Sequence, residues 1–389
     1  MKEKKVTVAL IGMGGYGINY VNEILNNSEA YGMTCVAMAD VCPEKCKYYE
    51  DVRAQGIPIY PSLEALYENH QPDLLFISTP IQFHCRQTCF ALKHGSHVLC
   101  EKPIAATLEN AEKMFQTAKE TNLFVAIGFQ RCYNSAVLAA KNDAISGRYG
   151  SPIKFKSIIG QRRNLAYFQR GWAGKLKAGD DYIYDSVANN SSAHYLHNLF
   201  FMAGEALNTS AFPDKIEAEC YRGNHIENYD TITAKIRTTS GIDLYFAAFQ
   251  CGEKDYKHYA CCQFEKGTIT FEQDGRIVGR LDTGETIDYG KLSTGYGSKV
   301  LCAVEAVRGK DTIFCDINTA MAHIYTIQYI QDHVEVQDLT DRSEVINVAK
   351  EGETPELIRC VKGLDEAMLD CFRREAMLSS WYKGERGIN

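Results

Sequence analysis

The stretch that decides the fold is Val6-Thr7-Val8-Ala9-Leu10-Ile11-Gly12-Met13-Gly14-Gly15-Tyr16-Gly17, close to the start of the chain. Its apolar run predicts a buried strand, and the turn G-x-G-x-x-G follows that strand directly and opens a helical segment. In this setting Gly12 allows a tight turn, Gly14 lets the backbone approach a pyrophosphate, and Gly17 permits close packing. The N-terminus of the helix favours an anionic group. The stretch therefore predicts a dinucleotide-binding βαβ unit, in which Met13, Gly15 and Tyr16 also border the cofactor.

An acidic residue, Asp40, ends the second predicted strand 23 residues after Gly17. A carboxylate at this place accepts hydrogen bonds from ribose hydroxyls and repels a 2′-phosphate. The following Val41-Cys42-Pro43 offers no arginine to receive such a phosphate. The sequence therefore favours NAD over NADP. The alternative interpretation is that Asp40 caps a helix starting near Pro43.

Short apolar runs alternate with helical periodicity over the first 130 residues, which is the pattern of a parallel sheet built from βαβ units. Right-handed crossovers then give a doubly wound Rossmann sheet over residues 1–130. The predicted strands are Val6 to Ile11, Thr34 to Ala39, Leu74 to Ser78, His97 to Cys100 and Phe124 to Ile127. The predicted helices are Tyr16 to Asn27, Leu63 to Glu68, Gln82 to His94 and Leu108 to Thr121.

The pattern changes after residue 130 to longer alternating stretches, which predict a large, mostly antiparallel open sheet with one covered face. The predicted strands are Pro152 to Ile159, Lys215 to Tyr221, Thr231 to Arg237, Leu244 to Gln250 and Thr268 to Gln273. Helices return from about Lys299, and an amphipathic helix is expected from Glu356 to Ser379. We therefore expect a second α/β domain over residues 131–389 that ends in a helical extension from about residue 339.

Composition excludes several classes of protein. The 389 residues are 45% hydrophobic and 23% charged, as in soluble globular proteins. The net charge of −7 and the lack of a dense basic block argue against nucleic acid as a partner. The N-terminus has too few apolar residues for a signal peptide or membrane span, so we expect a cytoplasmic protein. The fifteen cysteines include no C-x-x-C, which predicts reduced thiols and no metal site.

Two further motifs accompany the glycine turn. The sequence Ser78-Thr79-Pro80-Ile81-Gln82-Phe83-His84 follows the predicted strand from Leu74, and Glu101-Lys102-Pro103 follows the strand from His97. The order glycine turn, T-P-x-x-x-H and E-K-P resembles the Gfo/Idh/MocA oxidoreductase family over the first 130 residues. The likeness is weaker beyond, where Gly128-Phe129-Gln130-Arg131 and a later Asp/His segment look like the family's continuation.

The resemblance implies two domains, the second with a large open sheet often used for oligomer contacts. It implies hydride exchange between a nicotinamide and a hydroxyl carbon of a sugar, polyol or related compound. Lys102 would lie at the active site, Glu101 would border the nicotinamide ribose, and Thr79, Pro80 and His84 would line the dinucleotide.

Oxidation of a secondary alcohol needs a base for the hydroxyl proton beside the nicotinamide. The segment from Asp185 to His197 concentrates polar residues, and His194 and His197 share a helix face. We expect His194 to be the general base and Lys102 to polarise the hydroxyl. The alternatives are that the two histidines are core or interface residues, or metal ligands with Asp185.

This segment departs from the family, which places an aspartate four residues before the catalytic histidine and often an acidic residue three after it. Asn190 and His197 stand at those positions, and Asp185 lies nine residues before the histidine. Asp185 or Asn190 would therefore orient the imidazole or bind substrate, and His197 is a candidate substrate residue. Arg131 and Trp172 complete the expected substrate contacts, because aromatic faces with nearby polar groups suit sugar rings.

Three functions follow from these observations. The leading one is an NAD-dependent dehydrogenase acting on a secondary hydroxyl of a sugar, polyol or glycoside. The second keeps NAD bound and uses transient oxidation for glycoside cleavage or epimerisation, and the third is a non-catalytic sugar or nucleotide sensor. A one-faced sheet needs a cover, so we expect a homodimer or homotetramer.

Overall fold

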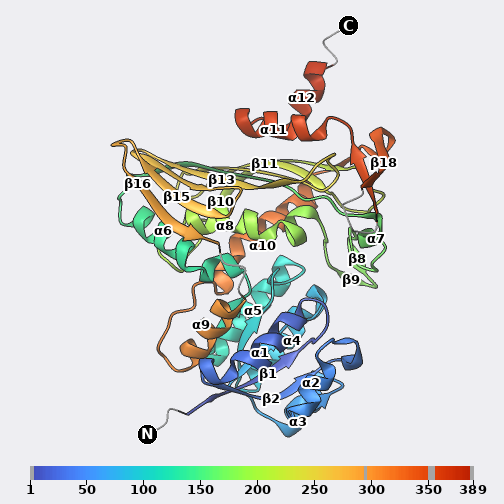
Figure 1. Ribbon diagram of the computed structural model, residues 1–389, viewed down its shortest axis with the longest axis vertical. Coiled ribbons are helices and arrows are strands. Elements are labelled where there is room, and N and C mark those ends of the chain that lie inside the picture. Colours follow the sequence, from blue (N-terminus) through green and yellow to red (C-terminus); the bar gives the residue numbers. More distant parts are fainter. Residues whose placement is uncertain (1–3, 293–295, 349–354, 386–389) are drawn as a thin grey trace. The chain divides into compact units, whose positions relative to one another are not determined.

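The computed structural model describes residues 4–292, 296–348 and 355–385 (Figure 1). Two compact units share the chain: the first comprises Met1–Asn134 with Ser293–Met321, and the second comprises Ser135–Leu292 with Ala322–Asn389. The segment Ser293–Met321, which the sequence placed with the second half, thus belongs to the first unit. Among the described residues, no helix combines the length and the apolar character needed to cross a membrane.

The first unit is built on a six-stranded parallel sheet with the strand order β3-β2-β1-β4-β5-β6. This is the doubly wound order of a Rossmann fold, as predicted. The strands are β1 (Val6–Ile11), β2 (Met33–Ala39), β3 (Ile59–Tyr60), β4 (Leu74–Ile77), β5 (His97–Cys100) and β6 (Val125–Ile127).

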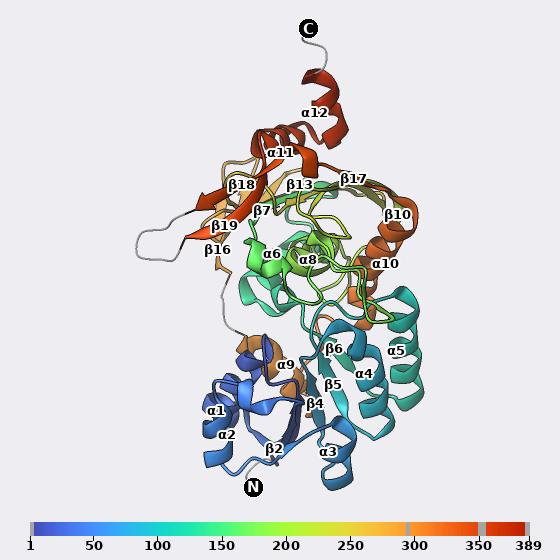
Figure 2. The same ribbon diagram turned by 90° about the vertical axis from the view of Figure 1, so that its right-hand side faces the viewer.

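Helices cover both faces of this sheet (Figure 2). On one side lie α1 (Gly17–Tyr31), α2 (Tyr49–Ala54) and α9 (Gly297–Val307), and on the other lie α3 (Leu63–Asn69), α4 (His84–Lys93) and α5 (Leu108–Thr121). The returning helix α9 buries Val300, Ala303 and Val304 in the same apolar core as the strands and α1. These three residues recur at helical spacing, so α9 has an apolar face that it buries in this core.

The second unit contains a nine-stranded mixed sheet with the order β16-β15-β14-β13-β7-β12-β11-β10-β17. Only the pairs β7 with β12 and β10 with β17 are parallel. The strands are β7 (Pro152–Gly160), β10 (Pro213–Arg222), β11 (Thr231–Thr238), β12 (Asp243–Phe249), β13 (Tyr256–Phe264), β14 (Gly267–Phe271), β15 (Arg276–Leu281), β16 (Thr286–Lys291) and β17 (Val336–Asp338).

The prediction of a single covered face is wrong for the middle of this sheet. One face carries α6 (Ser135–Ile145), α8 (Ala193–Met202) and the second-unit part of α10 (Ile317–His333), and α11 (Leu364–Arg374) lies over the other (Figure 1). Leu364, Met368 and Phe372 of α11 pack on Tyr245 and Phe249 of β12. The outer face of the central strands is therefore closed by the chain itself.

The predicted helix from Glu356 to Ser379 is wrong over its first residues. Glu356–Val361 forms strand β19, which pairs with β18 (Ser343–Val348). Gly363 then adopts a left-handed conformation with φ of 75° before α11 begins, and α12 (Leu378–Glu385) follows. Ladder hydrogen bonds to β18 and the glycine together separate what looked like one helical pattern.

Candidate functional site

The glycine turn after β1 has a backbone that larger residues would not tolerate. Gly12 has φ of 90°, and a Cβ there would lie 2.4 Å from the carbonyl oxygen of Ser78. A Cβ on Gly17 would lie 2.0 Å from the carbonyl oxygen of Gly12, whereas one on Gly14 would meet nothing within 4 Å. The N-cap residue of α1, Tyr16, makes no side-chain capping bond. The turn thus leaves an open approach beside Gly14 and helix amides suited to an anion.

Asp40 closes the other side of this turn. Its carboxylate accepts hydrogen bonds from the amides of Met13, at 2.6 Å, and Cys42, at 2.8 Å. An ionised carboxylate has about four lone-pair positions, so the group retains capacity for hydroxyl donors. The short helix Pro43–Lys45 has Cys42 as its N-cap, so Asp40 does not occupy the capping position that the alternative interpretation required.

The T-P-x-x-x-H segment joins the loops after β4 and β5. The hydroxyl of Thr79 donates to Oε1 of Gln87 at 2.5 Å. The ring nitrogens of His84 lie 2.9 Å from the carbonyl oxygens of Thr79 and Pro103. His84 is only 1% exposed, and burial lowers its pKa, whereas the contacts with the carbonyl oxygens of Thr79 and Pro103 act in the opposite direction. The ring lies between the two loops and contacts the backbone of both. Pro80 is exposed at the surface of the same loop.

Glu101 is a buried acidic group with several partners in the first unit. It forms an ion pair with Lys299, and its Oε1 also accepts a hydrogen bond from the hydroxyl of Tyr20 at 2.7 Å. The amide of Lys102 donates to the other carboxylate oxygen at 3.2 Å. Burial raises the pKa of Tyr20 well above its ordinary value, so the phenol keeps the proton that it donates. The side chain of Lys102 is half-buried.

Sequence reasoning missed Lys299, Tyr20 and Gln87. The signal for Lys299 was a lysine at helical spacing from apolar residues, since Ala303 stands four positions later. A solvated face is the usual reading of such a lysine, and only the return of α9 to the first unit shows that it is buried. Arg131, which the sequence proposed as a substrate contact, is half-buried in the turn Gln130–Tyr133 of the first unit.

The remaining predicted residues lie in the second unit, where Asp185 and Asn190 meet. Asn190 donates its amide to Asp185 at 2.7 Å, and the backbone amide of Gly174 donates to the other carboxylate oxygen at 2.6 Å. Asn190 belongs to a π-helical turn, Val187–Ser191, directly before α8. Asp185 therefore organises the loop that leads into the histidine-bearing helix.

Both candidate histidines lie on α8, as predicted, but in different environments. His194 is half-buried near the start of the helix, whereas His197 is 1% exposed. Burial lowers the pKa of His197 far below its ordinary value, and nearby His323 and Lys141 lower it further. The neutral ring of His197 is therefore suited to packing or to hydrogen bonding. Of the two histidines, His194 is the more exposed.

A pocket of about 400 Å³ lies beside the Asp185 loop. It shares Gly174 with that loop, and it offers polar and aromatic groups from several segments. Its lining comprises Phe168, Ala173, Gly174, Lys175, Arg222, His225, Ile226, Glu227, Asp338 and Thr340. Trp172 is 36% exposed and does not line this pocket; its ring packs edge-on against Tyr167 with the centroids 5.8 Å apart.

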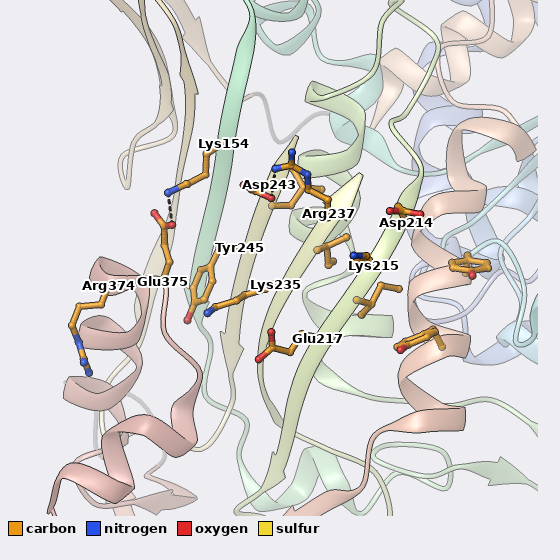
Figure 3. A pocket seen from close by; sticks show the side chains of 15 residues that line it. Lys154, Asp214, Lys215, Glu217, Lys235, Arg237, Asp243, Tyr245, Arg374 and Glu375 are labelled. Carbon is orange, nitrogen blue, oxygen red and sulfur yellow. Dashed lines mark ion pairs between the residues drawn. The ribbon is translucent and has the colours of Figure 1, made fainter. Parts of the chain in front are cut away.

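A larger groove of about 710 Å³ lies on the outer face of the sheet beside α11 (Figure 3). None of the predicted site residues lines it. Two ion pairs join lining residues, with Lys154 2.7 Å from Glu375 and Arg237 2.7 Å from Asp243. We interpret this groove as a solvated surface with charges of both signs.

Comparison with known proteins identifies the first unit. Residues 6–129 match the Gfo/Idh/MocA profile, described as an oxidoreductase family with an NAD-binding Rossmann fold. Residues 6–129 thus form a Rossmann fold of the Gfo/Idh/MocA type. Within this family the chain is 34% identical to 1,5-anhydro-D-fructose reductase of Ensifer adhaerens over 131 residues, covering 33% of this chain and 39% of the relative. The chain spans about a third of the length of the first curated relatives that it matches.

Two further similarities extend past the Gfo/Idh/MocA Rossmann unit. A glycosyl hydrolase family 109 protein of Porphyromonas gingivalis is 30% identical over 263 residues, 62% of this chain and 55% of that protein. The WlbA dehydrogenase of Bordetella pertussis, solved with NADH and UDP-GlcNAcA, has a TM-score of 0.68 at 20% identity and covers 84% of this chain and 95% of its own. The latter likeness confirms the predicted two-part α/β fold.

Proposed function

We propose that this chain is an NAD-dependent oxidoreductase that transfers a hydride between a nicotinamide and a secondary hydroxyl of a sugar, polyol or glycoside. The observation that carries the proposal is the convergence of three motif loops within the first unit. His84 connects the T-P-x-x-x-H loop to the E-K-P loop, while Asp40 is hydrogen bonded to the glycine turn. Relatives that bear the names of inositol and anhydrofructose enzymes support the substrate class.

The first unit fits a dinucleotide. The space beside Gly14, the uncapped start of α1 and the spare acceptor capacity of Asp40 suit a pyrophosphate and a ribose. Met13, Gly15, Tyr16, Thr79 and Pro80 would border it, Glu101 would accept from the nicotinamide ribose, and His84 would position the loops. NAD is favoured over NADP because Asp40 repels a 2′-phosphate. When bound, the nicotinamide supplies the hydride acceptor.

The chain's own chemistry is then the removal and return of one proton. Lys102 would donate a hydrogen bond to the reacting hydroxyl and so favour its deprotonation, and His194 would accept the proton. Asp185, paired with Asn190, would hold the loop before α8 and thereby orient His194. Trp172, Arg131 and His197 stay candidate substrate residues, and a cytoplasmic homodimer or homotetramer stays a prediction.

A specific observation favours a second candidate, in which NAD stays bound and transient oxidation enables glycoside cleavage. The similarity to the family 109 glycosyl hydrolase spans 263 residues and so continues beyond the family match at residues 6–129. The proposed proton chemistry at Lys102 and His194 serves both reactions. In the second reaction the oxidised sugar would also lose a proton beside the new carbonyl together with its glycosidic oxygen, add water, and take the hydride back. No reduced cofactor would then leave the protein.

The deciding experiment analyses the small molecule released by denatured protein and then follows NADH with a panel of polyols, sugars and glycosides. The dehydrogenase proposal expects NADH formation that is lost in Lys102→Ala and His194→Ala. Retained NAD with glycoside consumption and no NADH supports the second candidate. Failure to bind any dinucleotide overturns both.

A further inference from the structure

Lys299 is a lysine buried inside the first unit. Its side chain is 1% exposed, and that of its ion-pair partner Glu101 is 7% exposed. The rings of Tyr16 and Tyr20 lie 4.8 Å and 4.9 Å from its ammonium, within the range of cation–π attraction. Removing two charges from water is costly, and well-packed apolar residues often serve stability equally well. The pair therefore calls for a reason other than stability.

The first reason for burying the pair is that it fixes the orientation of the Glu101 carboxylate in the E-K-P loop. Glu101 is held by Lys299 and Tyr20 through one carboxylate oxygen and by the amide of Lys102 through the other. A Cβ on Gly128 would lie 2.8 Å from this carboxylate, so the backbone of the next segment closes over it. The orientation of the carboxylate is thus determined by groups from four segments of the first unit.

The second reason is that Lys299 is also hydrogen bonded to Tyr16 in the glycine turn. The ammonium of Lys299 donates to the hydroxyl of Tyr16 at 3.2 Å, and that hydroxyl donates to Oε1 of Gln130 at 3.0 Å. Burial raises the pKa of Tyr16 far above its ordinary value, so the phenol can accept and donate at the same time. One ammonium consequently links the glycine turn, the E-K-P loop and the segment that follows β6.

We propose that Lys299 is a positioning residue of the dinucleotide site, which holds Glu101 and Tyr16 in the geometry that receives NAD. The inference rests on the proposed function, because it assigns a task to a residue beneath the same site. It explains why a segment more than 150 residues beyond the family match places a charged side chain in the core of the first unit. Without its ammonium, Glu101 would be left buried without a counter-charge.

The test measures NAD⁺ and NADH affinity of the full chain by calorimetry in Lys299→Met, Glu101→Gln and the double variant. We expect Lys299→Met to weaken binding by about 30-fold or more, since a charge is left unpaired. The double variant should lose less than the two single losses combined, because the pair acts as a unit. Lys310→Met, an exposed lysine of the same returning segment, serves as the matched control and should bind as the wild type does.

Tyr16→Phe keeps the test decisive if Lys299→Met does not fold. It retains the ring and the ion pair but removes both hydrogen bonds of the hydroxyl, the one from Lys299 and the one to Gln130. We therefore expect affinity to fall by about 5-fold or more. Wild-type affinity in a folded Lys299→Met overturns the inference, as does wild-type affinity in Tyr16→Phe if the lysine variant is unfolded. A wild-type chain that binds no dinucleotide overturns the proposed function instead, so the two failures are distinct.

Discussion

The two units of this protein each contain an ion pair, and the two pairs differ strongly in their exposure to water. The first buries Lys299 and Glu101 at 1% and 7% side-chain exposure and surrounds them with hydrogen-bonding partners. The second keeps Arg237 and Asp243 at 49% and 53% exposure on the open part of its outer sheet face. Buried pairs respond strongly when one partner is removed, whereas exposed pairs contribute little. This difference in exposure predicts which single substitutions should reduce the free energy of unfolding strongly and which should leave it nearly unchanged.

Packing follows the same division. The parallel sheet of the first unit has helices on both faces, and its motif loops contact one another through buried backbone groups. The nine-stranded sheet of the second unit is covered on one face, but only α11 and its neighbours cover the other. A substitution in the glycine turn should therefore destabilise the whole first unit, whereas a substitution in the outer groove should have little effect on the stability of the second.

The largest loss of stability is expected from Gly17→Ala in the first unit. The added Cβ would lie 2.0 Å from a backbone carbonyl oxygen that cannot move without disturbing β1. We expect a loss of unfolding free energy on the order of 4 kcal/mol or an unfolded first unit. Urea denaturation followed by circular dichroism measures this.

Gly14→Ala is the matched control, because a Cβ there meets nothing within 4 Å. Its stability should stay within about 1 kcal/mol of the wild type, the scale of an exposed glycine change, while NAD affinity falls because the approach beside the turn is filled. Equal stability of the two variants would show that the turn is not as tightly determined as the structure indicates.

These glycines also show how much of the molecule a sequence can predict. The close contact at Gly17 is with Gly12, five residues away, and Gly12 needs a positive φ, so both requirements of the turn are local in the sequence. The turn, its strand and the doubly wound sheet were predicted correctly. The burial of Lys299 depends on a return of the chain that no local pattern encodes. The strand over Glu356–Val361 was missed because a short apolar run fits helix and strand equally well until its partner is known.

The second-largest effect should come from Met368→Ala in α11. This side chain is fully buried in the cluster with β12, so its loss should cost about 3 kcal/mol through transfer and cavity terms. Glu366→Ala, an exposed neighbour on the same helix, should be close to neutral. A neutral Met368→Ala would mean that α11 does not close the outer face.

This helix also bears on the predicted homodimer or homotetramer. That expectation rested on a sheet face in need of a cover, and α11 supplies part of that cover within one chain. Light scattering of Met368→Ala tests the point, because loosening of the cover should increase self-association if the apolar face is the driving surface.

A smaller effect is expected from pH through His97 in the first unit. Its Nδ1 accepts the amide of Phe124 at 3.1 Å, and burial lowers its pKa while Asp73 raises it slightly. The unfolded chain therefore binds a proton more readily, so stability is full above the unfolded pKa and falls as the pH drops below about 6.5. Linkage to a single proton limits the loss to about 1.4 kcal/mol per pH unit.

His97→Asn preserves an acceptor at the position of Nδ1 but does not titrate. Its baseline stability should be lower, because the stacked contact with Phe124 at 4.1 Å is reduced. The pH dependence, measured by urea denaturation between pH 7.5 and 5.5, should be shallower than that of the wild type. Identical slopes would show that His97 has the same proton affinity in both states.

The smallest effect should come from Arg237→Ala in the outer groove, which tests the other side of the comparison. Its guanidinium lies 2.7 Å from Asp243, yet both side chains are about half exposed, so solvent screens their attraction and both lose rotamer freedom by pairing. We expect a loss of less than about 0.5 kcal/mol. A double-mutant cycle with Asp243→Ala isolates the pair, and a coupling well above 1 kcal/mol would mean that this face is shielded from water in solution. Such a result would make the open groove a candidate subunit contact. An ion pair that is half exposed in one chain reaches the strength of a buried pair only if another chain covers it.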